Sequence, residues 1–351
     1  TSVRWRGDRL FMGIGFFSTQ VAFDIGSKNT YLATSTGFFG SEATFLLKDE
    51  DGKYIFGNKA ELYAGKIPME MSAIKPVKSD AVQDYDALVT YVRMFLRKAL
   101  GASFSSFDAI MTLPPNATGV QKIAEIEAVK QVGAKNVYVA LRPVMIRDAL
   151  GVDKAAPVMI VDMGEDNFSI SVVQGGKVLI NRVLNFAGNN MRKSVVDFAR
   201  ANYGIVIGEA QAEMIKNKLA SAMPEADAAA GDKIIGMTVD TKTRAEFLVT
   251  MRDLYAALKD YYFRLSKEIL EVFKLLDRNV AALLKNQAVY LVGGSSNVRY
   301  LPDFLSINTG ANVMQVRDIK SLTCRAALKV FNNKETLKRY KNIRTEWGYI
   351  N

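Results

Sequence analysis

The residues best suited to chemistry in this chain are two aspartates, each at the end of an apolar run. Residues 21–30 read VAFDIGSKNT and residues 159–167 read MIVDMGEDN, so Asp24 and Asp162 each open an Asp-x-Gly turn. A carboxylate at a strand end can hold a hydrated Mg²⁺, and successive N–H groups of the following turn can bind phosphate oxygens. Asp24 and Asp162 are therefore candidates to bind Mg²⁺ through water beside a phosphate site, and an ordinary turn after a strand is the alternative for each.

A third glycine turn supports this prediction. Residues 288–305 read AVYLVGGSSNVRYLPDFL, which predicts a strand, a Gly-Gly turn and a helix that begins at Ser295 or Ser296. Glycine turns and helix N-termini allow a ligand to approach the backbone closely. One Asp-x-Gly turn is common and carries little weight. Two of them followed by this third segment are a much rarer combination and favour a ligand-binding site.

The elements that must position these turns are predicted from the spacing of apolar residues. The repeated strand–turn–strand pattern indicates two related halves. Helices are expected over residues 84–100, 119–132, 143–150 and 246–284. Strands are expected over residues 231–247, ending in a helix that starts near Arg244.

The composition limits the classes of function. The chain has 351 residues, enough for two domains with a core each, and no histidine, which excludes Ser-His and Cys-His nucleophile pairs and His-ligated metals. The single Cys324 excludes an internal disulfide and suits a reducing compartment. A net charge of +10 implies an acidic partner. We expect an anionic membrane rather than nucleic acid, because no nucleic-acid-binding motif is present; a merely solvated basic surface is the alternative.

At these motifs the sequence resembles the MreB family of bacterial actins, within the actin-like ATPase superfamily. The two Asp-Gly turns resemble its two phosphate loops, residues 207–216 (IGEAQAEMIK) resemble the segment near the nucleoside, and residues 292–295 (VGGS) resemble the adenosine-side turn. The motifs occur in the family's order along nearly the whole chain. The resemblance implies an α/β, actin-like fold of two RNase H-like domains with a nucleotide cleft between them, each carrying a small inserted subdomain.

The resemblance also implies domain boundaries. Domain IA would comprise residues 1–37 and 74–150, with subdomain IB at residues 38–73. Domain IIA would comprise residues 151–186 and 244–317, with subdomain IIB at residues 187–243. Residues 318–351 would form a C-terminal segment that returns to domain IA.

The function implied by the resemblance is a cytoskeletal filament subunit that binds ATP or ADP with Mg²⁺. Its partners would be copies of itself, in paired protofilaments, and other MreB paralogues, and the filament would act in cell shape or in the motility of a wall-less cell. The implied nucleotide-binding residues are Gly26, Ser27, Lys28, Asn29, Thr30, Gly164, Glu165, Asp166, Asn167, Gly188, Asn189, Glu209, Glu213, Met214, Ile215, Lys216, Gly293, Gly294, Ser295, Ser296 and Asn297.

Departures from the family pattern weaken the implied ATPase. In the second loop, Glu165 and Asp166 replace glycines, and acids repel phosphate; Lys28, in place of an alanine, is expected to compensate. Gln121 stands where the family has its catalytic glutamate, and Asn167 where it has a threonine. An amide cannot accept a proton, and loss of a general base typically costs about 10²–10⁴-fold in rate.

These positions leave three functions open. Weak or absent ATP hydrolysis is the first expectation, and Arg142-Pro143 in place of Glu-Pro near the hinge adds to it. A fully active polymerising ATPase is the alternative, because Gln can orient water. A sugar kinase or an Hsp70-like nucleotide-binding protein is a further alternative, against which stands the lack of an added substrate or peptide-binding domain.

Two segments are predicted to reach a membrane. Residues 1–20 combine arginines with Trp5 and phenylalanines, the composition of an interfacial anchor, although an arm packed on domain I fits equally well. The Ser-rich loop 101–107 carries Phe104 and Phe107 and matches a loop that contributes to membrane insertion in the family; internal packing of the two rings is the alternative. The expected location is the cytoplasm, peripheral at the inner face of the cell membrane.

Overall fold

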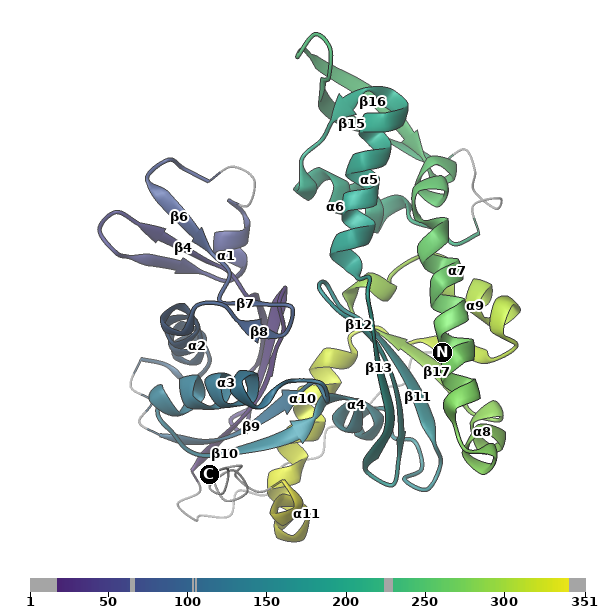
Figure 1. Cartoon of the computed structure of the whole chain (residues 1–351). Helices are drawn as coiled ribbons and strands as arrows, with labels where there is room; N and C mark the ends of the chain where they lie inside the picture. The colour runs from purple at the N-terminus through teal and green to yellow at the C-terminus, as the bar shows by residue number, and fades with distance from the viewer. Residues whose placement is uncertain (1–17, 64–66, 103, 105, 224–229, 341–351) are drawn as a thin grey trace.

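The computed structural model of the chain describes residues 18–63, 67–102, 104, 106–223 and 230–340. It has two lobes side by side, with a pair of helices between them (Figure 1). The calls made above for residues 1–17, including most of the predicted N-terminal anchor, lie outside the described residues, as do the last eleven residues of the chain.

Lobe I is built on a five-stranded sheet of order β10-β9-β1-β2-β3. Its strands are β1 (Thr19–Ile25), β2 (Asn29–Thr34), β3 (Phe39–Ala43), β9 (Phe107–Leu113) and β10 (Ala134–Leu141). Strand β1 pairs antiparallel with β2 and parallel with β9. Because β1 is central and covered on both faces, its apolar run is fully buried.

Lobe II repeats this arrangement in a sheet of order β13-β12-β11-β17-β18. Its strands are β11 (Val158–Met163), β12 (Phe168–Gln174), β13 (Lys177–Leu184), β17 (Ala288–Val292) and β18 (Asn312–Gln315). Strand β11 pairs antiparallel with β12 and parallel with β17. The predicted internal repeat is therefore present in the strand pairing.

Helices α4 (Arg142–Leu150) and α10 (Ile319–Lys329) lie between the two sheets (Figure 1). A single apolar cluster joins Ile110 of the first sheet, Ile160 of the second, Ile146 of α4 and Cys324 of α10. The two lobes thus share one layer of core at the base of the cleft.

The remaining helices cover the outer faces. In lobe I these are α2 (Tyr85–Leu100) and α3 (Gly119–Gln131), and in lobe II they are α7 (Met251–Leu275), α8 (Arg278–Lys285) and α9 (Leu301–Thr309). The short elements η2 (Gly294–Ser296), η3 (Val330–Asn332) and α11 (Lys334–Arg339) complete the C-terminal part of the described chain.

Each lobe carries a smaller unit above its sheet (Figure 1). Above lobe I lie β4 (Leu46–Asp49), β5 (Tyr54–Phe56), α1 (Asn58–Glu61), β6 (Met71–Ile74) and the hairpin of β7 (Val77–Lys78) and β8 (Ala81–Val82). Above lobe II lie α5 (Gly188–Tyr203), β14 (Ile205–Val206), α6 (Glu209–Leu219), β15 (Gly231–Thr238) and β16 (Arg244–Thr250).

The prediction of a helix start near Arg244 is wrong. Residues 244–250 form strand β16, which pairs with β15, and the helix begins at Met251. Its start is fixed by a capping box in which Thr250 and Asp253 each accept the other's backbone N–H. The long prediction also joined two helices, since α7 ends at Leu275 and α8 begins at Arg278.

The prediction that Phe107 meets a membrane is wrong. Phe107 is the first residue of β9 and is fully buried, with its ring 6.4 Å from that of Phe23. Phe104 is half-buried and packs edge-on against Phe107, with 6.2 Å between ring centres. Internal packing, the alternative considered for this pair, therefore describes both rings. In the part of the chain that the structure describes, no helix has the length and apolar character needed to cross a membrane.

Candidate functional site

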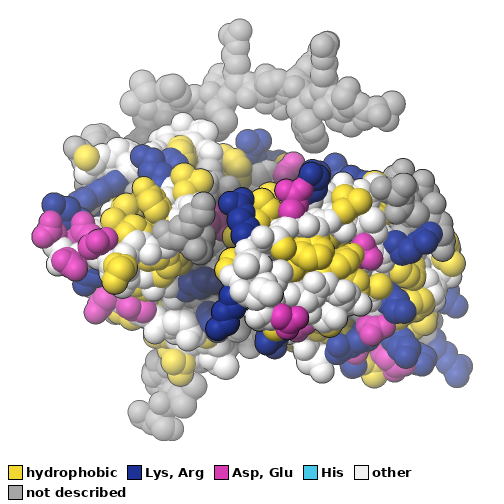
Figure 2. Space-filling view, turned by 90° about the horizontal axis from the view of Figure 1, so that it is seen from above, with side chains coloured by type: hydrophobic (Ala, Val, Ile, Leu, Met, Phe, Trp, Pro, Cys, Tyr) yellow, Lys and Arg dark blue, Asp and Glu magenta, His cyan; other side chains and the backbone are white. Residues whose placement is uncertain are grey.

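A cavity of about 300 Å³ lies between the two lobes. Both Asp-Gly turns, the Gly293-Gly294 turn and the start of α10 line it. Viewed from above, Lys and Arg side chains gather where the lobes meet (Figure 2). The volume is at the lower end of the range for small-ligand sites, and the position between two lobes is typical of them.

The two Asp-Gly turns have the same backbone geometry. The N–H of Gly26 donates to the carbonyl of Asn29 at 3.1 Å, and that of Gly164 donates to the carbonyl of Asn167 at 3.0 Å. A Cβ on Gly26 would lie 2.9 Å from that carbonyl oxygen, and one on Gly164 would lie 2.8 Å from its counterpart. Each turn therefore needs glycine at this position.

The third turn packs directly against the second. Gly293 has a φ of +91°, and a Cβ there would lie 2.5 Å from the carbonyl oxygen of Met163. The hydroxyl of Ser295 donates to the carbonyl of Gly164 at 3.1 Å. These contacts bring β17 and the second Asp-Gly turn to one wall of the cavity, as the sequence predicted.

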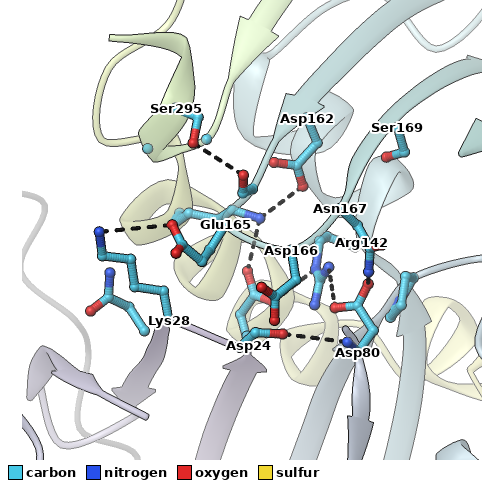
Figure 3. A pocket seen from close by; sticks show the side chains of 18 of the residues that line it. Asp24, Lys28, Asp80, Arg142, Asp162, Glu165, Asp166, Asn167, Ser169 and Ser295 are labelled. Carbon is cyan, nitrogen blue, oxygen red and sulfur yellow. Dashed lines mark hydrogen bonds and ion pairs between the residues drawn. The ribbon is translucent and has the colours of Figure 1, made fainter. Parts of the chain in front are cut away.

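The two aspartates predicted to hold Mg²⁺ are instead paired with two cations (Figure 3). Arg142 Nε donates to Asp24 Oδ1 at 2.9 Å, and Lys320 Nζ lies 3.0 Å from Asp162 Oδ2 and 3.5 Å from Asp24 Oδ2. Arg142 also donates to the carbonyl of Ile25 at 3.3 Å. Arg142 is placed at the first residue of α4, immediately after β10, and Lys320 at the second residue of α10.

The electrostatics of the group are those of a matched set of ion pairs. Burial alone would raise the pKa of Asp24, but Arg142 and Lys320 hold it below its usual value. Burial would lower the pKa of Lys320, but Asp162 and Asp24 raise it. Burial would also lower the pKa of Arg142, but Asp24 and Asp80 outweigh this and hold it above its usual value. Asp24, Lys320 and Arg142 are therefore charged at neutral pH.

These residues do not fit the predicted Mg²⁺ site. Mg²⁺ requires near-octahedral oxygen ligands and keeps several waters, whereas Asp24 and Asp162 direct oxygens at Arg142 and Lys320. Within the described residues, no group of three or more His, Cys, Asp or Glu side chains is arranged to hold a metal ion. Among the described residues the two aspartates thus form ion pairs, while Asp24 Oδ2 and Asp162 Oδ1 accept no hydrogen bond there.

The acids of the second loop are bound by donors of the protein. Glu165 pairs with Arg192. Asp166 accepts from the N–H of Ser79 at 2.9 Å and from the side-chain amide of Asn189 at 3.0 Å. The carboxylates of Glu165 and Asp166 are therefore bound by groups of the protein, which reduces the repulsion that they were expected to exert on phosphate.

Besides the hydrogen bond between Ser79 and Asp166, two further polar contacts join the lobes across the cavity. Asn167 Nδ2 donates to Asp80 Oδ2 at 2.6 Å. Lys28 Nζ donates to Glu213 at 2.9 Å and lies 3.9 Å from Glu165, so its nearer partner is Glu213 rather than the loop acid it was expected to offset. Burial would raise the pKa of Glu213, but Lys216 and Lys28 lower it to about 2.

Most of the predicted nucleotide-binding residues line the cavity. The lining includes Gly26, Ser27, Lys28, Asn29, Gly164, Glu165, Asp166, Asn167, Glu213, Gly293, Gly294, Ser295 and Asn297. The others lie behind it or beside it: Thr30, Gly188, Asn189, Glu209, Met214, Ile215, Lys216 and Ser296.

Two of these residues, Thr30 and Ile215, are too buried to contact a nucleotide in the cavity with their side chains. Thr30 is buried and its hydroxyl lies 2.9 Å from that of Thr44, so it fastens β2 to the following segment. Ile215 is fully buried in the core of lobe II. The motif placed both segments near the cavity. However, the side chain of Thr30 on β2 and that of Ile215 on α6 point to the opposite side, into the core.

Gln121 does not line the cavity. Its side-chain carbonyl accepts from the N–H of Thr118 at 2.7 Å, and its own N–H donates to the Thr118 hydroxyl, so the two residues form the capping box of α3. Asn167, the other predicted catalytic position, does line it.

The sequence analysis missed several residues of the site. Arg142 was noted only as a departure, and Lys320, Asp80 and Tyr31 were not considered, although all four line the cavity. Glu125, one turn beyond Gln121, is buried close to the same group, and burial raises its pKa to about 8. A polar residue at the end of a strand gives a local signal, as Arg142 does, whereas Lys320 opens a helix from a distant part of the chain and gives none.

Comparison with known proteins gives consistent matches. The sequence profile of the MreB/Mbl protein family matches residues 18–339. The chain is 25% identical over 326 residues to the cell shape-determining protein MreB of Escherichia coli K12, covering 88% of this chain and 92% of that protein. It is 23% identical over 296 residues to the cell shape-determining protein Mbl of Bacillus subtilis 168, covering 83% and 89%.

Solved structures share the fold. The crystal structure of MreB5 of Spiroplasma citri bound to ADP matches with a TM-score of 0.83 at 17% identity, over 92% of this chain and 98% of that chain. The MamK double helical filament matches with a TM-score of 0.74 at 16% identity, over 90% and 99%. The fold of the chain is therefore the actin-like fold that the sequence predicted.

Proposed function

Because the chain belongs to the MreB/Mbl protein family, an actin-like group of bacterial cytoskeletal proteins, we propose that it is a filament subunit that binds an adenine nucleotide in the cavity between its lobes. The observation that carries the proposal is the pairing of two Asp-Gly turns of equal geometry across one cavity, closed by the Gly293-Gly294 turn. The structural neighbours named above include one bound to ADP and one in a filament.

The phosphates would occupy the space between the two turns. Backbone N–H groups of a turn bind phosphate oxygens, and the first turn also supplies the hydroxyl of Ser27 and the ammonium of Lys28, which is about a third exposed (36%). The adenosine would lie toward Gly294 and the exposed Asn297. We keep the domain boundaries given from the sequence as part of the proposal, with two changes: β3 belongs to the main sheet of lobe I, and β16 belongs to the smaller unit above lobe II.

Hydrolysis of the nucleotide is proposed to be weak. Gln121 caps α3 outside the cavity, and Asn167, which lines the cavity, donates its amide nitrogen to Asp80. Neither amide can accept a proton from an attacking water. Mg²⁺ is left out of the proposal because Asp24 and Asp162 are already ion-paired.

The first test is filament assembly with nucleotide binding. The full chain is titrated with ADP, and negatively stained samples with ATP, with ADP and without nucleotide are compared by electron microscopy. We expect binding, filaments and slow phosphate release, and we expect Gln121→Glu to leave that release unchanged, because residue 121 caps α3 outside the cavity. Phosphate release that Gln121→Glu raises about tenfold would show that residue 121 acts on the nucleotide, and fast release by the wild type would favour a fully active ATPase.

A pair of matched variants locates the site. Asn297→Trp places a large ring in the cavity wall, whereas Asn312→Trp places it on the exposed part of β18. The first variant should lose ADP binding and the second should keep it. Equal binding by both would show that the nucleotide does not use this cavity.

We also propose peripheral association with an anionic membrane and co-assembly with paralogues. The support is in the sequence: the Arg- and Trp-containing residues 1–20 and the basic residues after Asn332. Each basic residue near an anionic surface contributes about 1 kcal/mol. Co-sedimentation should need anionic liposomes and fall with added salt; equal pelleting with neutral liposomes would refute the membrane part.

A further inference from the structure

The cavity contains its own pair of cations at the position where the sequence predicts a metal. The two cationic side chains are largely buried, with exposed fractions of 11% for Arg142 and 17% for Lys320. Asp24 is 2% exposed and Asp162 is 14% exposed. Two carboxylates are thus matched by two positive charges, the same charge that one divalent cation would bring.

Both cations have donors left for a ligand. Arg142 has five N–H groups, of which Nε is bound to Asp24 and one Nη2 group to the carbonyl of Ile25, while Nη1 lies 3.8 Å from Asp80. Lys320 has three N–H groups and faces Asp162 and Asp24. Both side chains line the cavity together with the phosphate-binding turns.

A hydrated divalent cation could bind the two carboxylates only by displacing Arg142 and Lys320, which already neutralise them. The anionic oxygens of a phosphate chain would instead meet two cations that are already desolvated and held in place by carboxylates. Hydrogen bonds between ionised partners are the strong ones.

We propose that Arg142 and Lys320 bind the phosphate chain of a nucleoside diphosphate or triphosphate directly, so that this protein binds nucleotide without a divalent cation. The inference rests on the nucleotide binding proposed above and makes it more specific. Asp24 and Asp162 position the two cationic side chains. The phosphate oxygens would accept hydrogen bonds from the N–H groups that the aspartates leave unbound.

The test is an isothermal titration of the full chain with ADP, first in EDTA and then with Mg²⁺ in excess. The wild type should bind with dissociation constants that agree within about twofold. The Lys320→Gln variant should bind about tenfold more weakly in EDTA, because it loses a charge-assisted hydrogen bond to phosphate. Lys329→Gln, at an exposed position on the same helix, should bind as the wild type does.

Two further variants keep the test independent of folding. Arg142→Lys preserves the charge and should retain metal-free binding. The double variant Asp24→Asn/Arg142→Gln removes one ion pair as a unit, and should lose about tenfold in affinity in EDTA while its circular dichroism stays native.

The outcomes separate the two proposals. Wild-type binding that requires Mg²⁺ overturns the metal independence and leaves the nucleotide-binding function standing. Binding in EDTA that is unchanged by Lys320→Gln and by the double variant overturns the assignment of Arg142 and Lys320 as phosphate ligands. Absence of ADP binding with and without Mg²⁺ overturns the nucleotide-binding function itself.

Discussion

The two Asp-Gly turns share a backbone but differ in how their side chains are used. In the first turn Asp24 is buried against Arg142, while Ser27 and Lys28 remain at the cavity. In the second turn Asp162 is partly exposed against Lys320.

In the second turn the other two acids, Glu165 and Asp166, are also bound by groups of the protein. Glu165 is bound by Arg192, and Asp166 is bound by Ser79 and Asn189. The difference teaches that a repeated loop can keep its shape while one copy remains available for a ligand and the other becomes part of the framework.

The largest expected effect comes from removing the buried charge of the first turn. Asp24→Asn leaves Arg142 without its close carboxylate, and breaking a buried ion pair costs about 3–5 kcal/mol. Asp162→Asn should cost less, about 1–3 kcal/mol, because Lys320 keeps Asp24 as a partner. Free energies of unfolding in denaturant test this, with the exposed Asp197→Asn as the control. Equal losses at positions 24 and 162 would contradict the comparison.

The second effect is on pH dependence and arises only beside the first turn. Glu125 lies near Arg142, Asp80 and Asp24, and burial raises its pKa to about 8 from an ordinary 4.5. Between these values the folded protein holds a proton that the unfolded chain has lost, so the free energy of unfolding should fall as pH rises, by about 2 kcal/mol between about pH 6 and about pH 8.

Glu125→Gln should remove this fall. Glu213, beside the second turn, has a pKa lowered to about 2, so its contribution is present above its ordinary pKa and is lost only in acid. Unfolding curves measured at several pH values distinguish the two groups. A slope that persists in Glu125→Gln would assign it to another residue.

The smallest effect concerns the link that the second turn makes across the cavity. Asp166→Ala removes the acceptor for the N–H of Ser79 and should cost about 1 kcal/mol. Hydrogen exchange of the Ser79 amide should become faster in this variant. Ser27→Ala changes the first turn, which makes no contact with that amide, and should leave its exchange unchanged. Equal exchange in all three proteins would mean that the second turn does not hold the lobes together.

The sequence predicted the fold well because its signals are local or repeated. The Asp-Gly turns at residues 24–26 and 162–164, the buried strands before them and the helices over residues 84–100 and 119–132 all follow from adjacent residue types. The prediction failed at residues 244–250, where an apolar pattern that suited a helix forms a strand against β15. Pairing with a distant strand decided that segment, and the Thr250–Asp253 capping box marks where the helix begins.

The sequence by itself determined the shape of the two acidic turns and of the glycine turn, while their meeting at one site was implied by the resemblance to the family. Turn geometry depends on neighbouring residues, and glycine is required where a Cβ would strike a carbonyl. Only the tertiary structure decided what those acids bind. Arg142 and Lys320 reach Asp24 and Asp162 from helices 118 and 158 residues away in sequence, and an ion pair between such distant residues is fixed by how α4 and α10 pack between the two sheets.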